Sequence, residues 1–186
     1  MITDRLIQSL QTHAFGESEK YNIPPKALVE YTNEKGQWLA DKMHADKMIV
    51  LCGTLLMDCQ LGCAFQEKRM KEHVEMGIKK AEELLLADKD ITKEEKLNIL
   101  ACVREHHGTT KFSTLESEVC CNADCYKFVS TKGMIISIRY MRDSMDEMIK
   151  LFIDKVHEKW HALSFDICKK ELEPQYKSIL EFLQGF

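Results

Sequence analysis

Residues 48–58, MIVLCGTLLMD, form the most apolar stretch of the chain and indicate where its core lies. A helix that is apolar on almost every side is buried on most sides in a globular protein. We therefore expect a helix over residues 46–59 near the centre of the molecule, with Asp58 at its end.

The apolar periodicity on both sides of this stretch predicts more helices. With three prolines and eight glycines, the chain has few residues that favour turns, and no alternating strand pattern of any length occurs. We therefore predict an all-α fold, a compact multi-helix bundle in one domain over residues 1–186. The other expected helices cover residues 2–13, 26–42, 69–87, a segment ending at 108, 114–129, 133–162 and 167–184.

Several helix ends carry recognisable signals. Thr92 with Glu95, and Ser113 with Glu116, have the spacing of a capping box at a helix start. Gly108 stands where a helix C-cap is expected. Pro174 is expected to bend or break the last helix, because proline lacks the amide hydrogen that a helix interior needs.

Composition limits the kinds of partner. Lys and Arg number 26 against 30 Asp and Glu, a formal charge of -4, so bulk charge does not favour a nucleic acid polymer. No apolar run approaches the roughly 18 to 20 residues of a membrane span, and the N-terminus has no clear signal sequence. Eight cysteines without a secretory signal suggest reduced thiols. We expect a cytoplasmic protein without a membrane partner.

Five metal-ligand residues stand in or beside the predicted helices: Asp58, His73, His106, His107 and Asp124. Imidazole and carboxylate groups together suit a divalent first-row metal. Each residue also has an ordinary explanation: His73 as a surface residue beside Glu72, and the two adjacent histidines as favourable charges at a helix C-terminus. Asp124 is harder to explain in that way, because a charge inside an apolar helix needs a partner.

These positions also carry a resemblance. The segments WLADKMHADKMIVLCGTLLMD (38–58), EHVEMG (72–77), ILACVREHHG (99–108) and LESEVCCNADCYKF (115–128) resemble the HD-domain superfamily of metal-dependent phosphohydrolases over about residues 26–130. That family has its motifs in a set order: a His-Asp doublet, a single His, a His or His-His pair, and a final Asp. Residues 131–186 are then expected to be C-terminal helices packing on the HD-like part.

The sequence departs from the family pattern at two places. Met57 replaces the His of the doublet, and a thioether binds hard divalent ions poorly. The family's first His should fall near residues 28–31, where there is none, and His44 lies in a short turn that argues against this role. Leu61 stands where a lysine often follows the doublet.

The resemblance implies one divalent ion rather than two, of iron, manganese, zinc, nickel or magnesium, near Asp58, His73, His106, His107 and Asp124. It implies hydrolysis of a nucleotide or another small phosphate ester, with Asp58 and Asp124 closest to the chemistry. Lys111, Arg139 and Arg142 are candidate phosphate ligands, because arginine offers a bidentate fork, but surface solvation is the favoured explanation, since Lys and Arg are mostly exposed.

Two alternatives remain open. One is a non-catalytic HD-like ligand-binding or scaffold protein with a degenerate metal site. The other is a cysteine-ligated metal or redox protein, for which Cys59 with Cys63 and Cys120, Cys121 with Cys125 offer helical spacing but no CxxC pair. The same spacing is typical of core-facing cysteines. His157 and His161, one turn apart, are interpreted as surface residues, and the amphipathic C-terminal helices allow a homo-oligomer.

Overall fold

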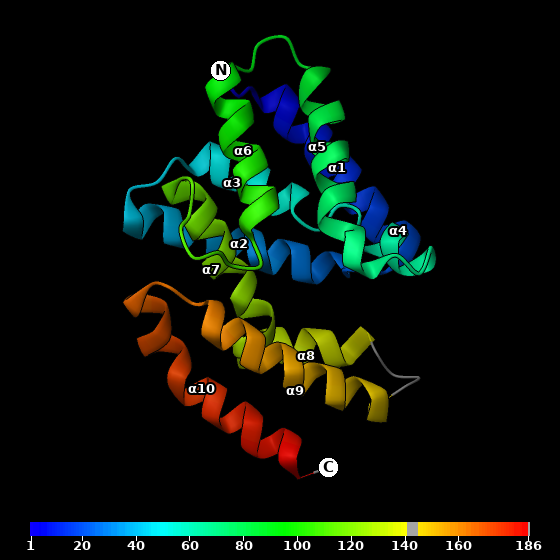
Figure 1. The fold of residues 1–186 in the computed structure, drawn as a ribbon, viewed down its shortest axis with the longest axis vertical. Coiled ribbons are helices and arrows are strands. Elements are labelled where there is room, and N and C mark those ends of the chain that lie inside the picture. The colour runs from blue at the N-terminus through cyan, green and yellow to red at the C-terminus, as the bar shows by residue number, and fades with distance from the viewer. Residues whose placement is uncertain (141–144, 186) are drawn as a thin grey trace.

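The computed structural model of the protein describes residues 1–140 and 145–185, and every regular element in those ranges is a helix (Figure 1). The predicted all-α class is confirmed. In chain order the elements are α1 (Asp4–Tyr21), α2 (Lys26–Met43), α3 (Lys47–Leu56), α4 (Leu61–Gln66), the 3₁₀ helix η1 (Met70–Glu72), α5 (His73–Leu86), α6 (Lys93–Glu105), α7 (Leu115–Val129), α8 (Thr131–Tyr140), α9 (Met145–Ala162) and α10 (Asp166–Gln184).

Helix α7 lies at the centre of the bundle. It packs against α2, α3 and α6 on one side and against α8, α9 and α10 on the other (Figure 1). The apolar stretch predicted to be central forms α3, whose residues Val50, Cys52 and Leu56 are completely buried. The core therefore rests on two helices, of which α7 carries more polar groups than α3.

The C-terminal helices enclose a second, smaller apolar cluster. Phe152 and Val156 of α9 meet Ile179 and Leu183 of α10 there. The main core extends into the same region through Leu163 and other buried residues that follow α9. In Figure 1 this part lies below α2 and α7, so α9 passes beneath the end of α6.

The capping predictions are confirmed at one helix and wrong by one residue at another. Thr92 and Glu95 form the expected capping box at α6, and Gly108 has a φ of 95° after its end. At α7 the N-cap is Thr114, with Ser117 as its reciprocal partner. Ser113 is instead drawn to the side chain of Glu105, to which it donates from both its amide and its hydroxyl group.

Several predicted boundaries also change. Helix α1 continues past Gly16 to Tyr21, because Ala14 and Ser18 are buried against the core on one face. The predicted helix over 133–162 is two helices, α8 and α9, separated by residues 141–144, which lie outside the described part. Pro174 does not break α10; both Pro174 and Lys170 are exposed, so water can satisfy the carbonyl group that proline leaves unpaired.

The stretch Lys47–Gln66 is long and apolar enough, by length and composition alone, to cross a membrane. Its most apolar window is 61% buried inside the protein. Core helices of soluble proteins have this same combination of apolar sequence and burial. From the sequence, no apolar run of this length is expected. The stretch is longer than predicted because the turn after α3 and helix α4 continue the apolar segment beyond Asp58.

We predict that Gly53→Ala destabilises the fold by about 1 to 3 kcal/mol, the usual cost of overpacking a core. An added Cβ atom would lie 2.5 Å from Cys102 Cβ and 2.8 Å from Cys120 Sγ, where α3 meets α6 and α7. Urea unfolding measures the change. In the control, Gly16→Ala, the new Cβ meets nothing within 4 Å, and stability should rise by about 0.5 to 1 kcal/mol. Equal effects at the two glycines would contradict the packing described.

Candidate metal centre

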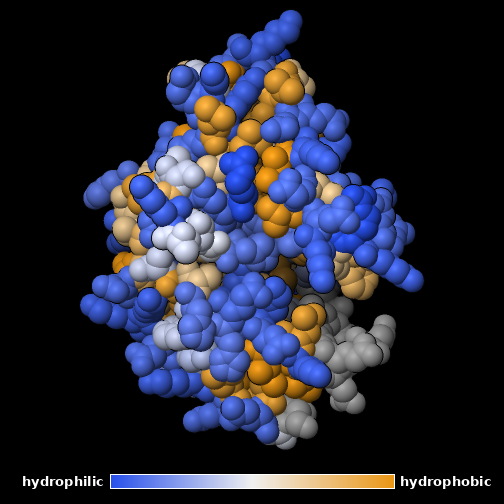
Figure 2. Space-filling view, viewed as in Figure 1, coloured by the Kyte–Doolittle hydropathy of each residue, from blue (hydrophilic) through white to orange (hydrophobic). Residues whose placement is uncertain are grey.

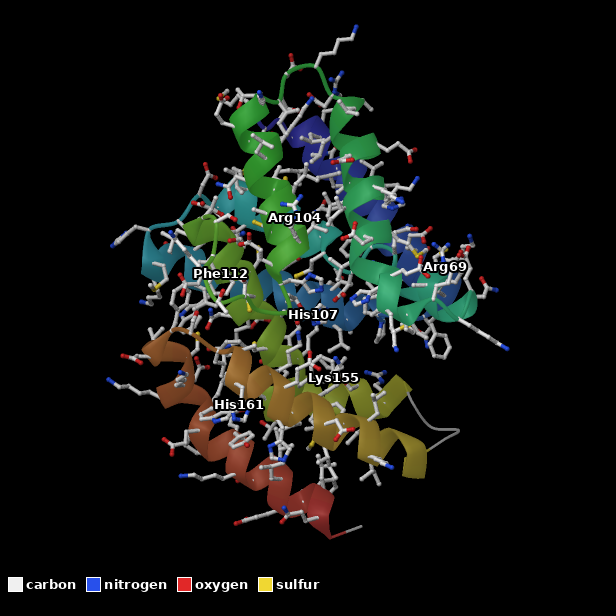
Figure 3. All side chains as sticks on the ribbon, in the orientation of Figure 1. Arg69, Arg104, His107, Phe112, Lys155 and His161 are labelled. Carbon is white, nitrogen blue, oxygen red and sulfur yellow. The ribbon has the colours of Figure 1, made fainter. Side chains whose placement is uncertain are left out.

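The five predicted ligand residues come from four separate segments that converge below α6. Asp58 lies in the turn between α3 and α4, His73 opens α5, and His106 and His107 follow the last residue of α6. Asp124 lies inside α7. Figure 3 shows His107 at the end of α6, directly above α9, which carries Lys155.

The three histidines form a compact group. One potential ligand atom from each of His73, His106 and His107 lies within 4.8 Å of the other two. Three imidazoles at such distances can hold a divalent metal ion. Asp58 is next to this group, with its Oδ1 atom 3.5 Å from His106 Nε2.

Two of the imidazole rings are oriented by backbone carbonyl groups. His106 Nδ1 is 2.8 Å from the carbonyl oxygen of Val103, and His73 Nδ1 is 2.7 Å from that of Met70. In the neutral form of each ring the nitrogen that faces the carbonyl carries the hydrogen, and Nε2 keeps its lone pair. In His106 this Nε2 atom is buried and has no hydrogen-bond partner.

His107 is held between its neighbours on three sides. Its Nε2 atom is 2.9 Å from His73 Nε2, while its Nδ1 atom is 2.9 Å from Lys159 Nζ and 3.4 Å from Glu158 Oε1. Burial, followed by the influence of His106 and Lys159, lowers the pKa of His107 to about 3. The ring is therefore neutral at physiological pH, the form in which imidazole binds a metal.

The two carboxylates have different partners from those the sequence suggested. Lys127 Nζ contacts Asp58 Oδ2 and lies 2.6 Å from Asp124 Oδ1. Lys159 Nζ lies 2.6 Å from the other oxygen of Asp124. All four side chains are largely or fully buried, so two acidic and two basic groups form a neutral cluster beside the histidines.

The electrostatic effects within this cluster support one another. Burial alone would raise the pKa of Asp58 and Asp124, but the nearby ammonium groups outweigh it and hold both pKa values below the ordinary range. Burial alone would lower the pKa of Lys127 and Lys159, and the carboxylates raise both instead. All four groups are therefore charged at neutral pH.

Sequence reasoning missed Lys127, Lys159 and Glu158. Lys127 did carry a signal, because it follows Asp124 by three residues and so lies on the same face of an apolar helix. Lys159 carried none, since it lies far along the chain in a helix that is rich in charge. Its place beside Asp124 depends on how α9 packs on α7.

Another side chain fixes the position of the adjacent histidines. Glu105, the last residue of α6, accepts hydrogen bonds from the Ser113 amide and from Ser117 Oγ at 2.9 and 2.7 Å. These bonds tie the end of α6 to the start of α7 across the turn at Gly108. They hold the backbone of His106 and His107 against α7.

The departures from the expected pattern are also visible. Met57 is buried, and Val29 is one of the residues near the expected place of the first His. Val29 lines a narrow pocket together with Asp58 and Lys127. The pocket has about 10 Å³ free for the centre of a water molecule, roughly the room that one water needs. His44 is exposed at the end of α2.

The candidate phosphate ligands lie on the surface. Lys111 and Arg139 are exposed, and within the described part of the chain neither contacts the histidines or the buried lysines. Arg142 lies outside the described residues. The positive charge beside the histidines comes from Lys159 and, farther out on α9, from Lys155.

The cysteines are all free thiols, and all but Cys63 are buried. In the described ranges, the group of three or more potential metal ligands that the structure brings together contains histidines alone. Burial raises the pKa of Cys52 and Cys59 to about 12, so these thiols stay protonated. They behave as small core residues.

Comparison with known proteins supports the fold. No protein-family model matches the chain, and no curated protein matches it in sequence. Among solved structures, the chain shares the fold of a predicted HD superfamily hydrolase from an uncultured Thermotogales bacterium. That match has a TM-score of 0.64 and 15% identity, and it covers 98% of this chain and 89% of the other.

A second structure, of a protein from Lactobacillus plantarum, matches with a TM-score of 0.73 and 17% identity, over 100% of this chain and 97% of the other. The helical fold shared with these two structures therefore extends over nearly the whole chain. At these identities the likeness shows the fold, and the chemistry has to be argued from the site itself.

We predict that Asp124→Asn destabilises the protein by about 3 to 5 kcal/mol at pH 7, because it leaves buried lysines without a counter-charge. Chemical unfolding measures the loss. Glu173→Gln, which breaks the exposed pair of Glu173 with Lys177, should cost less than about 1 kcal/mol.

The effect of Asp124→Asn should depend on pH. The pKa of Asp124 is lowered in the folded protein, so its stabilisation is complete above about pH 4, the ordinary carboxyl value. It is lost as the pH falls through the folded pKa. The stability difference between wild type and variant should therefore shrink in acid, and a difference that grew as the pH fell would contradict the ion-pair assignment.

Proposed function

We propose that this protein is a metal-dependent phosphohydrolase that acts on a nucleotide or another small phosphate ester, with one divalent ion held by His73, His106 and His107. The observation that carries the proposal is the buried Nε2 atom of His106, which makes no hydrogen bond and has Asp58 Oδ1 3.5 Å away. A buried nitrogen with a lone pair and no partner costs free energy, and a metal ion among the three imidazoles would satisfy it.

The surroundings of the three rings suit the same role. Histidines that ligate metals usually donate their other ring hydrogen to a carbonyl or carboxylate oxygen. Val103 and Met70 provide such carbonyl groups for two of the rings. His107 differs, because its Nδ1 atom accepts a hydrogen bond from the Lys159 ammonium group at 2.9 Å, so this arrangement holds for two of the three rings.

Three neutral imidazoles would leave the whole double charge of the ion uncompensated. A divalent ion in such a site polarises a phosphoryl oxygen and lowers the pKa of water toward 7. An anionic ligand such as a phosphate ester is therefore favoured. Lys155 of α9, whose side chain is 31% exposed, pairs with Glu158 at 2.6 Å and so balances the carboxylate that lies nearest His107.

The protein's own side chains would have distinct tasks in the reaction. Asp58 stays ionised beside Lys127, and its Oδ1 atom faces the histidines, so it can accept a hydrogen bond from an attacking water and orient it. Asp124 has both oxygens bound by lysines. Its task is to hold Lys127 and Lys159 in place, and we no longer assign it direct contact with substrate.

A non-catalytic ligand-binding protein is the second candidate, and one observation favours it. Both buried carboxylates are paired with ammonium groups that lower their pKa, which makes them weak proton acceptors. A protein of this kind would keep the metal and the anion-binding site without turning over the ester.

We predict that His106→Ala lowers bound metal at least tenfold, the order of loss expected when a ligand is removed. Elemental analysis of gently purified protein, and dialysis against Mn²⁺ or Zn²⁺, measure it. The control is His161→Ala, which removes an exposed imidazole whose Nδ1 contacts only the carbonyl of His157 among the described hydrogen bonds. Equal metal content in both variants would contradict the proposed site.

Hydrolysis is tested on the metal-loaded protein with p-nitrophenyl phosphate and a panel of nucleoside monophosphates. Turnover that disappears in His106→Ala and persists in His161→Ala supports the phosphohydrolase. Metal binding and ligand-induced thermal stabilisation without turnover support the second candidate, because a ligand that binds the native state raises stability by mass action.

A further inference from the structure

The strongest unexplained feature of the molecule is the position of Lys127. Its Nζ atom lies between two carboxylates from different segments, Asp58 in the turn after α3 and Asp124 on α7. The side chain is 4% exposed, and the carboxylate side chains are 11% and 3% exposed. The lysine side chain thus ends between two buried carboxylates.

Almost every carboxylate oxygen in this place is already bound by a lysine. Asp58 Oδ2 and Asp124 Oδ1 contact Lys127, and Asp124 Oδ2 contacts Lys159. Asp58 Oδ1 is the remaining oxygen, and it faces His106. The two acids therefore have one oxygen left for any added cation, on the side of the histidines.

Two facing carboxylates with a cation between them are also the arrangement in which a divalent ion bridges acidic ligands. Metal–oxygen distances of about 2.0 to 2.2 Å place the ion where an ammonium nitrogen would otherwise stand. An ammonium group and a divalent ion cannot share this position, because their charges repel at short range. Either one can neutralise the pair of acids.

We infer that the Lys127 ammonium group is a built-in cation that takes the place of a second divalent ion between Asp58 and Asp124, and so limits this centre to one ion. This inference rests on the proposed function, which assigns one ion to the histidines, and adds that no second ion binds between the two acids. It does not depend on turnover.

A narrow pocket with about 10 Å³ of free volume lies beside this position. Asp58 and Lys127 line it together with Ser18, whose buried hydroxyl oxygen has no hydrogen-bond partner. Water in the pocket, the Ser18 hydroxyl, the Asp58 carboxylate and the freed Oδ1 atom of Asp124 would together supply the oxygen ligands that a divalent ion prefers. The lysine fills a position otherwise suited to metal.

The test is the number of Mn²⁺ ions bound per chain at saturation, measured by equilibrium dialysis with elemental analysis at pH 7. Lys127→Met removes the charge and keeps a side chain of similar length. We expect wild type to bind one ion and Lys127→Met to bind two, with a larger rise of Tm on adding Mn²⁺. Lys127→Arg, which restores the positive charge, should return the count to one.

The matched control is Lys132→Met, which removes an exposed lysine paired with Glu34 and should bind as wild type does. An unchanged ion count in Lys127→Met would overturn the inference. If that variant does not fold, the number of Mn²⁺ ions bound by wild type is the test. Two ions per chain at saturation overturn the inference, and one ion supports it.

The result is distinguishable from failure of the proposed function. If wild type binds no ion while Lys127→Met binds one, the histidine site fails and the lysine inference stands. If wild type binds one ion, that ion is lost in His106→Ala, and Lys127→Met gains none, the histidine site stands and the lysine inference fails.

Discussion

The contact of Lys127 with Asp58 and Asp124 is the interaction on which the rest of the centre depends. Buried charges are tolerated only when they are paired, because removal from water costs several kcal/mol for each ion. Here the pairing joins the turn after α3 to α7, and Lys159 extends it to α9. The N-terminal part of the bundle and the C-terminal helices are thus joined by charge as well as by apolar packing.

This cluster divides the centre into two chemically different halves. On one side stand three imidazoles, two of them oriented by backbone carbonyl groups. On the other side, acids and lysines neutralise each other. A cation would find available lone pairs among the histidines and on the neighbouring Asp58 Oδ1 atom. The polar outer surface around this region (Figure 2) is compatible with a small, charged ligand.

The same framework shows how a helical bundle can position a site without any long loop. The ligand residues stand at helix ends, where Glu105 with its serine partners and Gly108 fix the direction of the backbone. Helix ends hold these side chains rigidly and still leave His73 and His107 partly exposed. Rigidity and access are both needed for a site that exchanges a ligand.

The family resemblance led us to expect Asp58, His73, His106, His107 and Asp124 close together. By itself, the sequence determined the all-α class, the central place of residues 48–58 and the capping box at Thr92. Local patterns of period, capping and residue type are sufficient for these, because each depends on neighbours within a few positions. The tertiary structure alone decided that Lys127 and Lys159 bind the two acids and that Ser113 donates hydrogen bonds to Glu105. It also decided that residues 133–162 are divided between α8 and α9. Those outcomes depend on which buried charges meet across helices far apart in the chain, and no spacing along a single helix encodes such a meeting.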